Sequence, residues 1–166
     1  MRKADTSREY PTRPIVGVGG IILIQPADAA LVGWSEALAA PGVVLVKRRF
    51  EPLAGEWSLP GGKVEAGETL EAATAREIVE EAGLVVEVGP LVEVLDRIFR
   101  DDDGRVRFHY VLVDYLCRAR GGCLGAGSDV SDVTIADPRN LAPFRLAAIT
   151  ETVIEKAFRL ESNVKG

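Results

Sequence analysis

Apolar residues gather in runs that predict a set of β-strands. The run from residue 15 to 24 is rich in Ile and Val, which is typical of a buried strand. Residues 43–49 predict a second strand, and residues 84–88, 91–100, 105–119 and 132–136 predict four more. The sequence DDDG at 101–104 separates two of these runs and is a turn signal, so we expect a β-hairpin there.

Two other segments predict helices. Between Thr69 and Ala82 the apolar positions fall on one side of a helix at about 100° per residue; they are Ala72, Ala75, Ile78, Val79 and Ala82. Gly83 follows where a helix C-terminal glycine is common. A second helix is expected from about Thr150 to Glu161. Strands and helices mix without βαβ regularity, so the predicted fold class is α+β, with helices packed on a mixed sheet.

The remaining segments predict loops and termini. Residues 1–13 are expected to form a flexible N-terminal arm and residues 162–166 a C-terminal tail, which leaves one domain at 14–161. Residues 25–42 predict a long loop that includes a helical turn, and residues 51–62 predict a turn-rich connection. A chain of 166 residues is long enough for one domain with a substantial core.

Composition and charge narrow the classes of function. The formal net charge of −5 argues against a nucleic-acid polymer or an anionic membrane as a partner, because both require a basic surface. Cys117 and Cys123 are too few for a disulfide framework, so we expect free thiols in a reducing compartment. The polar N-terminus has no apolar segment typical of a signal peptide, and no apolar run is long enough to span a bilayer. These features predict a cytoplasmic protein.

Glu77, Glu80 and Glu81 gather on one face of the first predicted helix. At 100° per residue they share a wedge of roughly 100°. Like charges at this spacing repel, and the sequence offers only Arg76 as a nearby cation and no partner at i+4. One interpretation is a solvated acidic face. The other is a site for a hard divalent cation, since Mg²⁺ and Mn²⁺ take oxygen ligands.

A glycine turn directly before the helix favours the metal site. Gly61 and Gly62 allow the backbone to approach a ligand closely. From residue 62 to 84 the segment resembles the Nudix box of the MutT-like Nudix hydrolases without a departure, at Gly62, Glu68, Arg76, Glu77, Ile78, Glu80, Glu81, Gly83 and Leu84. The strands before the box, the hairpin and the second helix also resemble a Nudix domain. The resemblance implies an α/β/α sandwich with a mixed β-sheet.

The resemblance assigns roles residue by residue. Glu77, Glu80 and Glu81 match the catalytic carboxylates that bind the divalent metal, and Gly61 matches the glycine whose carbonyl contacts it. The positions that support the box are Gly62, Glu68, Arg76 and Gly83. The implied cofactor is Mg²⁺, with Mn²⁺ as a substitute.

The resemblance also implies an activity. Nudix hydrolases cleave a nucleoside diphosphate linked to another moiety, and a small nucleotide-derived substrate is therefore expected. ADP-ribose, a nucleotide sugar and a modified nucleoside triphosphate all stay open, because Arg100 and Asp101 occupy positions where two subfamilies carry a distinguishing proline or tyrosine. The general base is expected among the box residues or in the loop after them, where Asp129 and Asp132 are the candidates and Asp132 is assigned the catalytic role.

Residues outside the box are candidates for substrate contact. Arg49 stands where relatives often contact phosphate, although Arg48 and Arg49 point to opposite faces of a strand and only one can face the site. Trp57 is expected to stack on a base or to pack within its loop, and His109 is interpreted as structural. A catalytically silent Nudix-like domain that senses nucleotides or binds a partner is the alternative function, and a homodimer is left open.

Overall fold

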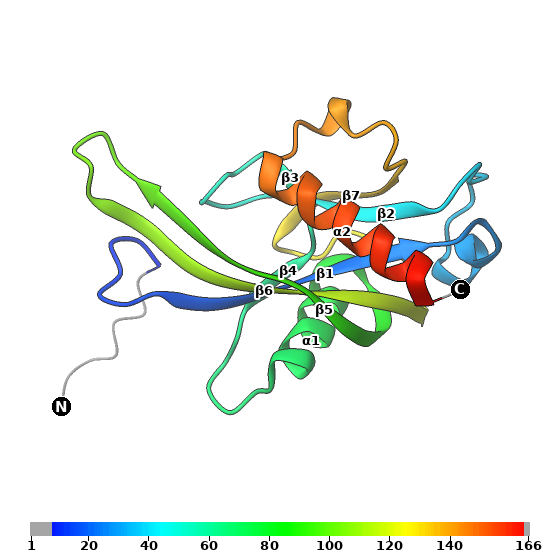
Figure 1. The fold of residues 1–166 in the computed structure, drawn as a ribbon, viewed down its shortest axis with the longest axis horizontal. Helices are drawn as coiled ribbons and strands as arrows, with labels where there is room; N and C mark the ends of the chain where they lie inside the picture. Colours follow the sequence, from blue (N-terminus) through cyan, green and yellow to red (C-terminus); the bar gives the residue numbers. More distant parts are fainter. Residues whose placement is uncertain (1–7, 165–166) are drawn as a thin grey trace.

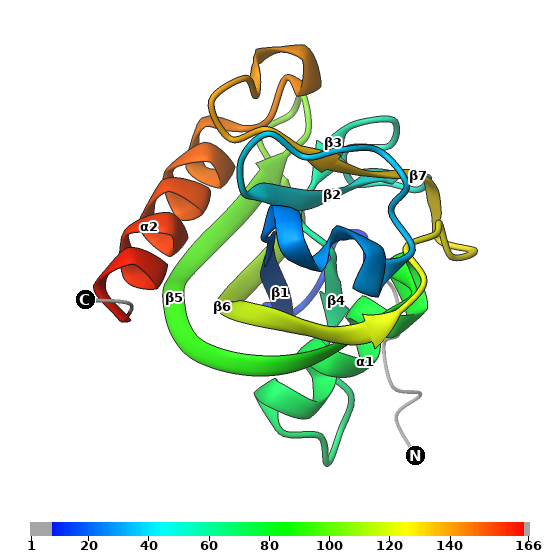
Figure 2. The same ribbon diagram turned by 90° about the vertical axis from the view of Figure 1, so that its right-hand side faces the viewer.

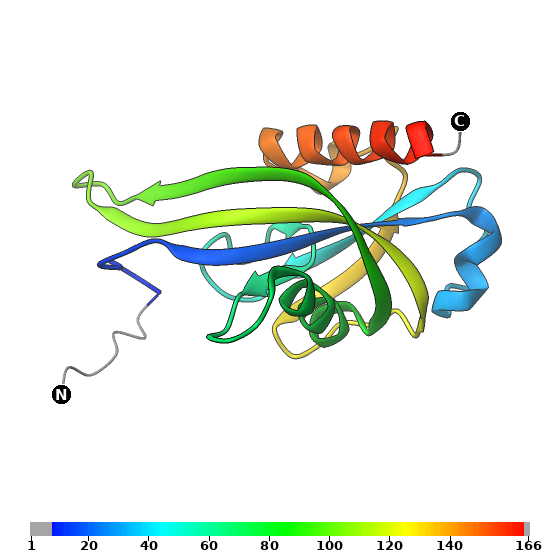
Figure 3. The same ribbon diagram turned by 60° about the horizontal axis from the view of Figure 1, so that its bottom comes forward.

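The computed structural model describes residues 8–164, in which two α-helices cover opposite faces of one β-sheet (Figure 1). In Figure 3, α2, drawn in red, lies above the sheet and α1 lies below it. The elements in chain order are β1 (Ile15–Ile24), the 3-10 helix η1 (Pro26–Val32), β2 (Gly42–Arg48), β3 (Trp57–Ser58), β4 (Gly61–Lys63), α1 (Leu70–Ala82), β5 (Leu84–Arg100), β6 (Val106–Gly122), β7 (Val130–Ala136), the 3-10 helix η2 (Ala142–Phe144) and α2 (Ala148–Val164).

The sheet is mixed, as predicted. Its strands follow the order β3-β2-β1-β6-β5, with β4 paired to β1 and β7 paired to β2. β1 and β6 run parallel, from Ile15 opposite Tyr110 to Ile22 opposite Cys117, and the other pairs are antiparallel. The predicted α/β/α sandwich with helices packed on a mixed sheet is therefore confirmed.

Alternating residues of the central strands build two separate cores, one on each face of the sheet. On β1, Ile22 packs toward α1 with Ile78, whereas Ile21 packs toward α2 with Ile154. Because side chains alternate between the two faces of a strand, a strand covered on both faces is apolar at nearly every position. This explains why residues 15–24 read as one unbroken apolar run.

The β5–β6 hairpin is the longest feature of the molecule, and its turn projects beyond both helices (Figure 3). β5 continues through residues 84–100, where two separate strands were predicted, and the pairing shifts register between Val88 and Leu91. Such irregularities bend a strand and increase its twist, and Figure 2 shows the strong curvature of β5. At the turn, the Asp101 side chain accepts hydrogen bonds from the backbone N–H groups of Asp103 and Arg105.

Parts of the predicted terminal segments belong to the described residues. Residues 8–10 of the arm are attached to the hairpin: the Tyr10 N–H donates to the Arg107 carbonyl at 2.8 Å, and the Tyr10 hydroxyl donates to Asp101 at 3.0 Å. Glu9 forms an ion pair with Arg107 at 2.6 Å. At the other end α2 continues to Val164, past the predicted start of the tail. Residues 1–7 and 165–166 lie outside the described residues.

Candidate active site

The Nudix-like segment folds as a short strand, a turn and a helix. β4 holds Gly61 opposite Gly19 of β1, and this pairing fixes the turn against the central sheet. The Thr69 side chain then accepts a hydrogen bond from the Ala72 N–H, which caps the start of α1. Gly83 ends the helix with φ 72°, a left-handed conformation that favours glycine. The sequence therefore places both ends of this helix correctly.

Arg76 is the centre of an ion-pair network between the turn and the helix. Its guanidinium contacts Glu68 at 2.5 Å, Glu77 at 2.8 Å and Glu80 at 3.3 Å. It also donates to the Lys63 carbonyl at 3.1 Å. The expectation that the helix glutamates lack a partner at i+4 was wrong, since Arg76 and Glu80 form that pair. The same contacts hold the loop against the helix.

Gly62 leaves the space that the Glu77 carboxylate occupies. A Cβ at position 62 would lie well under 3.0 Å from the Glu77 carboxylate atoms, so any larger residue would displace them. Burial raises the pKa of Glu77, and the hydrogen bond from Arg76 opposes that shift. The absence of a side chain at Gly62 therefore allows the Glu77 carboxylate to lie against the backbone of the turn.

Glu81 is the most strongly perturbed carboxylate of the helix. Its Oε2 accepts a hydrogen bond from the Gly61 N–H at 3.0 Å. Burial raises the pKa of Glu81 to about 7, although that hydrogen bond favours the charged form. The negative charges of Glu77 and Asp129 add to the shift. A buried carboxylate in this state is stabilised by any cation brought next to it.

The donor chemistry of this face fits a divalent cation. Three carboxylates extend from one helix face to the edge of the glycine turn, and the space beside Gly62 is shaped around one of them. In residues 8–164, however, no group of three or more acidic, His or Cys side chains is already gathered around a common point. Glu77 and Glu80 turn toward Arg76, and Glu81 turns toward the Gly61 N–H. A bound cation would compete with these protein partners.

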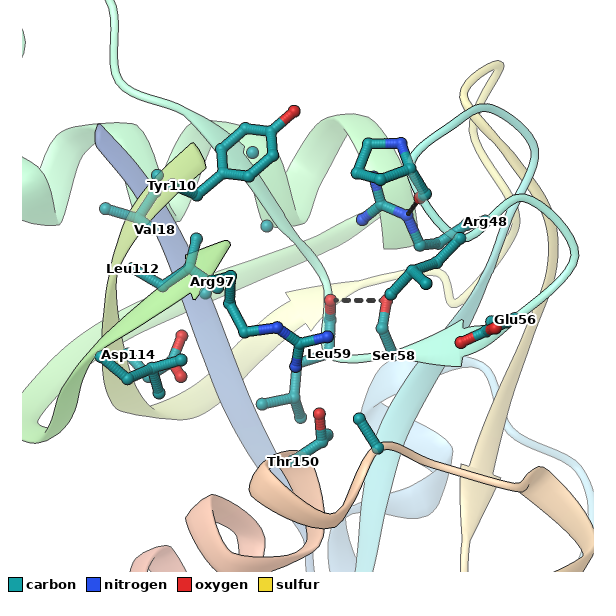
Figure 4. A pocket seen from close by; sticks show the side chains of 18 of the residues that line it. Val18, Arg48, Glu56, Ser58, Leu59, Arg97, Tyr110, Leu112, Asp114 and Thr150 are labelled. Atoms are coloured by element: carbon teal, nitrogen blue, oxygen red, sulfur yellow. Dashed lines mark hydrogen bonds between the residues drawn. The ribbon is translucent and has the colours of Figure 1, made fainter. Parts of the chain in front are cut away.

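A pocket of about 200 Å³ opens beside the glycine turn (Figure 4). Gly61, Gly62 and Glu77 form its edge, so the Nudix-like segment borders the pocket directly. The other lining residues come from the first strand, the β2–β3 connection, the β5–β6 hairpin and the start of α2. The main cationic side chains that line it are Arg8, Arg48, Lys63 and Arg97. They supply positive charge in a chain of net charge −5.

The structure separates the paired candidates outside the box. Arg48 lines the pocket, and its Nε donates to the Pro52 carbonyl at 2.8 Å, whereas Arg49 is exposed and is not part of the pocket wall. Asp129 lines the pocket, whereas Asp132 is exposed and accepts a hydrogen bond from the Val133 N–H at 2.8 Å. In each pair the residue that was assigned a role, Arg49 or Asp132, does not line the pocket and its neighbour does; the roles themselves stay predictions.

Trp57 lies at the pocket, and its stacking on a base stays a prediction. Its ring lines the pocket and also packs edge-on against Phe144, with 5.3 Å between the ring centroids. His109 is paired with Ile98 in the hairpin and does not line the pocket.

Sequence reasoning missed a group of pocket residues on the hairpin, above all Arg97, Tyr110 and Asp114. Their side chains point into the pocket beside Val18 and Leu112 (Figure 4). The available signal was weak, because the predicted strands at 91–100 and 105–119 carry several charged residues besides Arg97 and Asp114. Arg8 was missed for a different reason, since it belongs to the segment predicted to be a flexible arm.

Comparison with known proteins agrees with this geometry. The NUDIX domain family model matches residues 28–156. An ADP-ribose pyrophosphatase of Methanocaldococcus jannaschii is 38% identical over 117 residues, which are 70% of this chain and 66% of that protein. A putative 8-oxo-dGTP diphosphatase 2 of Mycobacterium tuberculosis is 64% identical over 45 residues, which are 26% of this chain and 32% of that protein. The chain thus spans less than two thirds of either relative.

Solved structures share the whole fold. A MutT NUDIX hydrolase from Burkholderia pseudomallei matches with a TM-score of 0.67 and 29% identity, over 87% of this chain and 98% of that one. The NUDIX domain of Shewanella oneidensis NrtR, solved with ADP ribose, matches in fold with a TM-score of 0.63 and 21% identity, over 94% of each chain. The chain therefore belongs to the Nudix hydrolase family, which acts on pyrophosphate bonds. None of the helices in residues 8–164 is long and apolar enough to cross a membrane.

Proposed function

We propose that this protein is an Mg²⁺-dependent pyrophosphohydrolase that cleaves a nucleoside diphosphate linked to a second moiety. The observation that carries the proposal is the shared border between the box and the pocket. Glu77 and the glycine turn at Gly61 and Gly62 form one edge of a cavity that also presents Arg48 and Lys63. A pyrophosphate needs this combination of a cation site and local positive charge.

The residues that would hold the cation are Glu77, Glu80, Glu81 and the Gly61 carbonyl. When bound, Mg²⁺ neutralises pyrophosphate charge and lowers the pKa of the attacking water. Hydrolysis joins the water oxygen to phosphorus and breaks the bond from that phosphorus to the bridging oxygen, which leaves with the electron pair. The water proton passes to a pocket carboxylate. Asp129 is better placed to accept it than Asp132, because Asp129 lines the pocket and Asp132 does not.

The substrate class follows from the relatives and stays within two alternatives. One relative is named for ADP-ribose and another for 8-oxo-dGTP. The first alternative is ADP-ribose or a nucleotide sugar, and the second is a modified nucleoside triphosphate. Both are small nucleotide-derived molecules that place a pyrophosphate next to a nucleoside, so both fit a pocket with one charged edge and an aromatic wall.

A substrate panel with Mg²⁺ or Mn²⁺ tests this function. We expect metal-dependent release of a nucleoside monophosphate from at least one nucleoside diphosphate derivative or nucleoside triphosphate, measured by chromatography of the products. Chelation of the metal should abolish release. A protein that binds these nucleotides but releases no product with either metal would instead be a silent, nucleotide-sensing Nudix domain.

A further inference from the structure

The floor of the pocket is a patch of three neighbouring strands with two opposite charges in it. β5 and β6 each contribute alternate side chains to this face, and β1 contributes glycines; the residues are Leu95, Arg97, Phe99, Tyr110, Leu112, Asp114, Gly17 and Gly19. Most of the patch is apolar or aromatic. Arg97 and Asp114 are its charged members, and they lie four register positions apart on adjacent strands, since Arg97 pairs with Tyr110 and Asp114 pairs with Glu93.

Asp114 is a buried carboxylate without a hydrogen-bond donor. It is 6% exposed, and within residues 8–164 the other buried polar side chain is Thr74, whose hydroxyl donates to the Leu70 carbonyl. No N–H or O–H group in this part of the chain donates to Asp114. A Cβ at Gly19 would lie well under 3.0 Å from its Oδ1, so a glycine is what leaves room for the carboxylate. Such a group costs stability unless something pairs with it.

Arg97 faces the same space and is also unpaired. Its guanidinium lies 5.1 Å from the centroid of the Phe99 ring, and burial lowers its pKa. It forms no ion pair within 4.0 Å with any acidic residue of the described chain, Asp114 included. The other charged groups near the two are Glu93, which is paired with Lys156, and Glu56 and Arg48. Figure 4 shows Arg97 and Asp114 reaching into one cavity from adjacent strands.

The position and sign of these charges indicate which part of a nucleotide they would meet. Gly61, just before the box, is opposite Gly19 on β1, and Gly19 is opposite Asp114 on β6. Two strand spacings, about 10 Å, therefore separate the phosphate edge from Asp114. A carboxylate repels phosphate and accepts hydrogen bonds, so a part of the nucleotide that carries hydrogen-bond donors suits Asp114 better than the phosphates do. The aromatic wall of Trp57, Phe99 and Tyr110 suits a planar ring.

We propose that Asp114 and Arg97 form a base-recognition subsite, in which the carboxylate accepts from the exocyclic amino group of a purine and the guanidinium donates to a ring nitrogen or carbonyl oxygen. Adenine and guanine both offer this chemistry. Base selectivity then follows from the cost of leaving a buried carboxylate unpaired when the amino group is missing. The assignment rests on the proposed function, which makes this pocket the substrate site.

Calorimetric titration with four purine nucleoside 5′-monophosphates separates the contribution of the base to affinity from that of the sugar and the phosphate. The ligands are AMP, GMP, IMP and purine riboside monophosphate, the last of which has no N–H group on its base. We expect the native protein to bind AMP or GMP at least tenfold more tightly than purine riboside monophosphate. Which of the two binds more tightly identifies the base. Binding does not require turnover, so this result is independent of the hydrolysis assay.

Two variants and one control complete the test. Asp114→Asn keeps the size of the side chain and should reduce the tenfold preference to less than threefold, because the affinity for the amino-bearing base alone falls. Arg97→Gln should weaken all four ligands, because each retains acceptors. Asp96→Asn lies on the opposite, exposed face of β5 and should behave as the native protein. An equal loss for all four ligands in Asp114→Asn, no loss, or no purine binding by the native protein would overturn the subsite.

Discussion

Among residues 8–164, charged side chains are paired within the protein at the Nudix box but not on the pocket floor. At the box, Arg76 forms ion pairs with Glu68, Glu77 and Glu80, and the Gly61 N–H donates to Glu81, so each of these four carboxylates has a partner within the protein. On the floor, Arg97 and Asp114 share one cavity and pair with nothing in the described chain. Both regions border the same pocket, yet the charged groups of the first have hydrogen-bond or ion-pair partners and those of the second have none among the described residues.

The difference distinguishes charged side chains that stabilise the folded site from charged side chains that are available to bind a ligand. Ion pairs that join a loop to a helix contribute to the free energy of folding, whereas unpaired buried charges reduce it. The Arg76 network therefore stabilises the geometry of the turn. The charged Asp114 carboxylate lowers stability in the free protein, and a ligand that donates to it would recover that loss as binding affinity.

Glu81→Gln should have the largest effect on activity. The variant keeps the shape of the side chain but removes a negative charge from the proposed metal site, and a loss of about 3 kcal/mol of transition-state stabilisation is roughly a hundredfold in rate. We expect kcat to fall at least a hundredfold at saturating substrate, with folding unchanged by circular dichroism. Glu71→Gln, at the exposed start of the same helix, is the control. Near-native turnover in Glu81→Gln would remove the catalytic role of this face.

Asp114→Asn should change how stability depends on pH. Burial raises the pKa of Asp114 from 3.8 to about 6, so the folded state binds this proton more tightly than the unfolded chain. The resulting stability is fully present below pH 3.8 and is lost as the pH rises through about 6. Relative to Asp114→Asn, the free energy of unfolding of the native protein should fall by about 2 to 3 kcal/mol between these two pH values. Urea unfolding at several pH values measures this, and a constant difference across the range would contradict the buried, unpaired state.

Arg76→Ala should lower both stability and activity. It leaves Glu68, Glu77 and Glu80 without their cation, and the network is partly exposed, so we expect a loss of about 2 kcal/mol in the free energy of unfolding. Arg159→Ala removes an exposed i,i+4 pair with Glu155 and should cost less than about 0.5 kcal/mol. If Arg76→Ala lost activity with an unchanged unfolding curve, Arg76 would be a direct contact of the substrate and not a support of the loop.

The smallest effect is expected for Asp132→Asn. Its carboxylate is exposed and bonds to the N–H of the next residue, outside the pocket. We therefore expect kcat to fall less than about tenfold, which is less than about 1.4 kcal/mol. Asp129→Asn, at the pocket wall, should lose more. Steady-state kinetics of the two variants on the same substrate compare the two losses. A larger loss in Asp132→Asn would support Asp132 as the general base.

Local pattern was enough to predict much of the fold and the box. Residues 15–24 predict a buried strand because both of its faces are covered, and residues 69–83 predict a capped helix because the cap residues act within one turn. The resemblance of residues 62–84 to the Nudix box identified the family before the fold was known. The helix caps depend on residues that are close in the sequence, and the apolar run at 15–24 records burial on both faces without naming the partners, which is why the sequence alone was enough to predict them.

Tertiary structure decided which of several equivalent residues reach the pocket. Arg48 and Arg49 are alike in sequence, and only the register of β2 with its neighbours places Arg48 in the wall. Asp129 and Asp132 differ in the same way, because β7 begins between them. Arg97 and Asp114 line one pocket only because β6 folds back along β5. Gly19, on a third strand, leaves room for the Asp114 carboxylate. Contacts between such distant segments depend on strand pairing, which no local pattern of residues specifies.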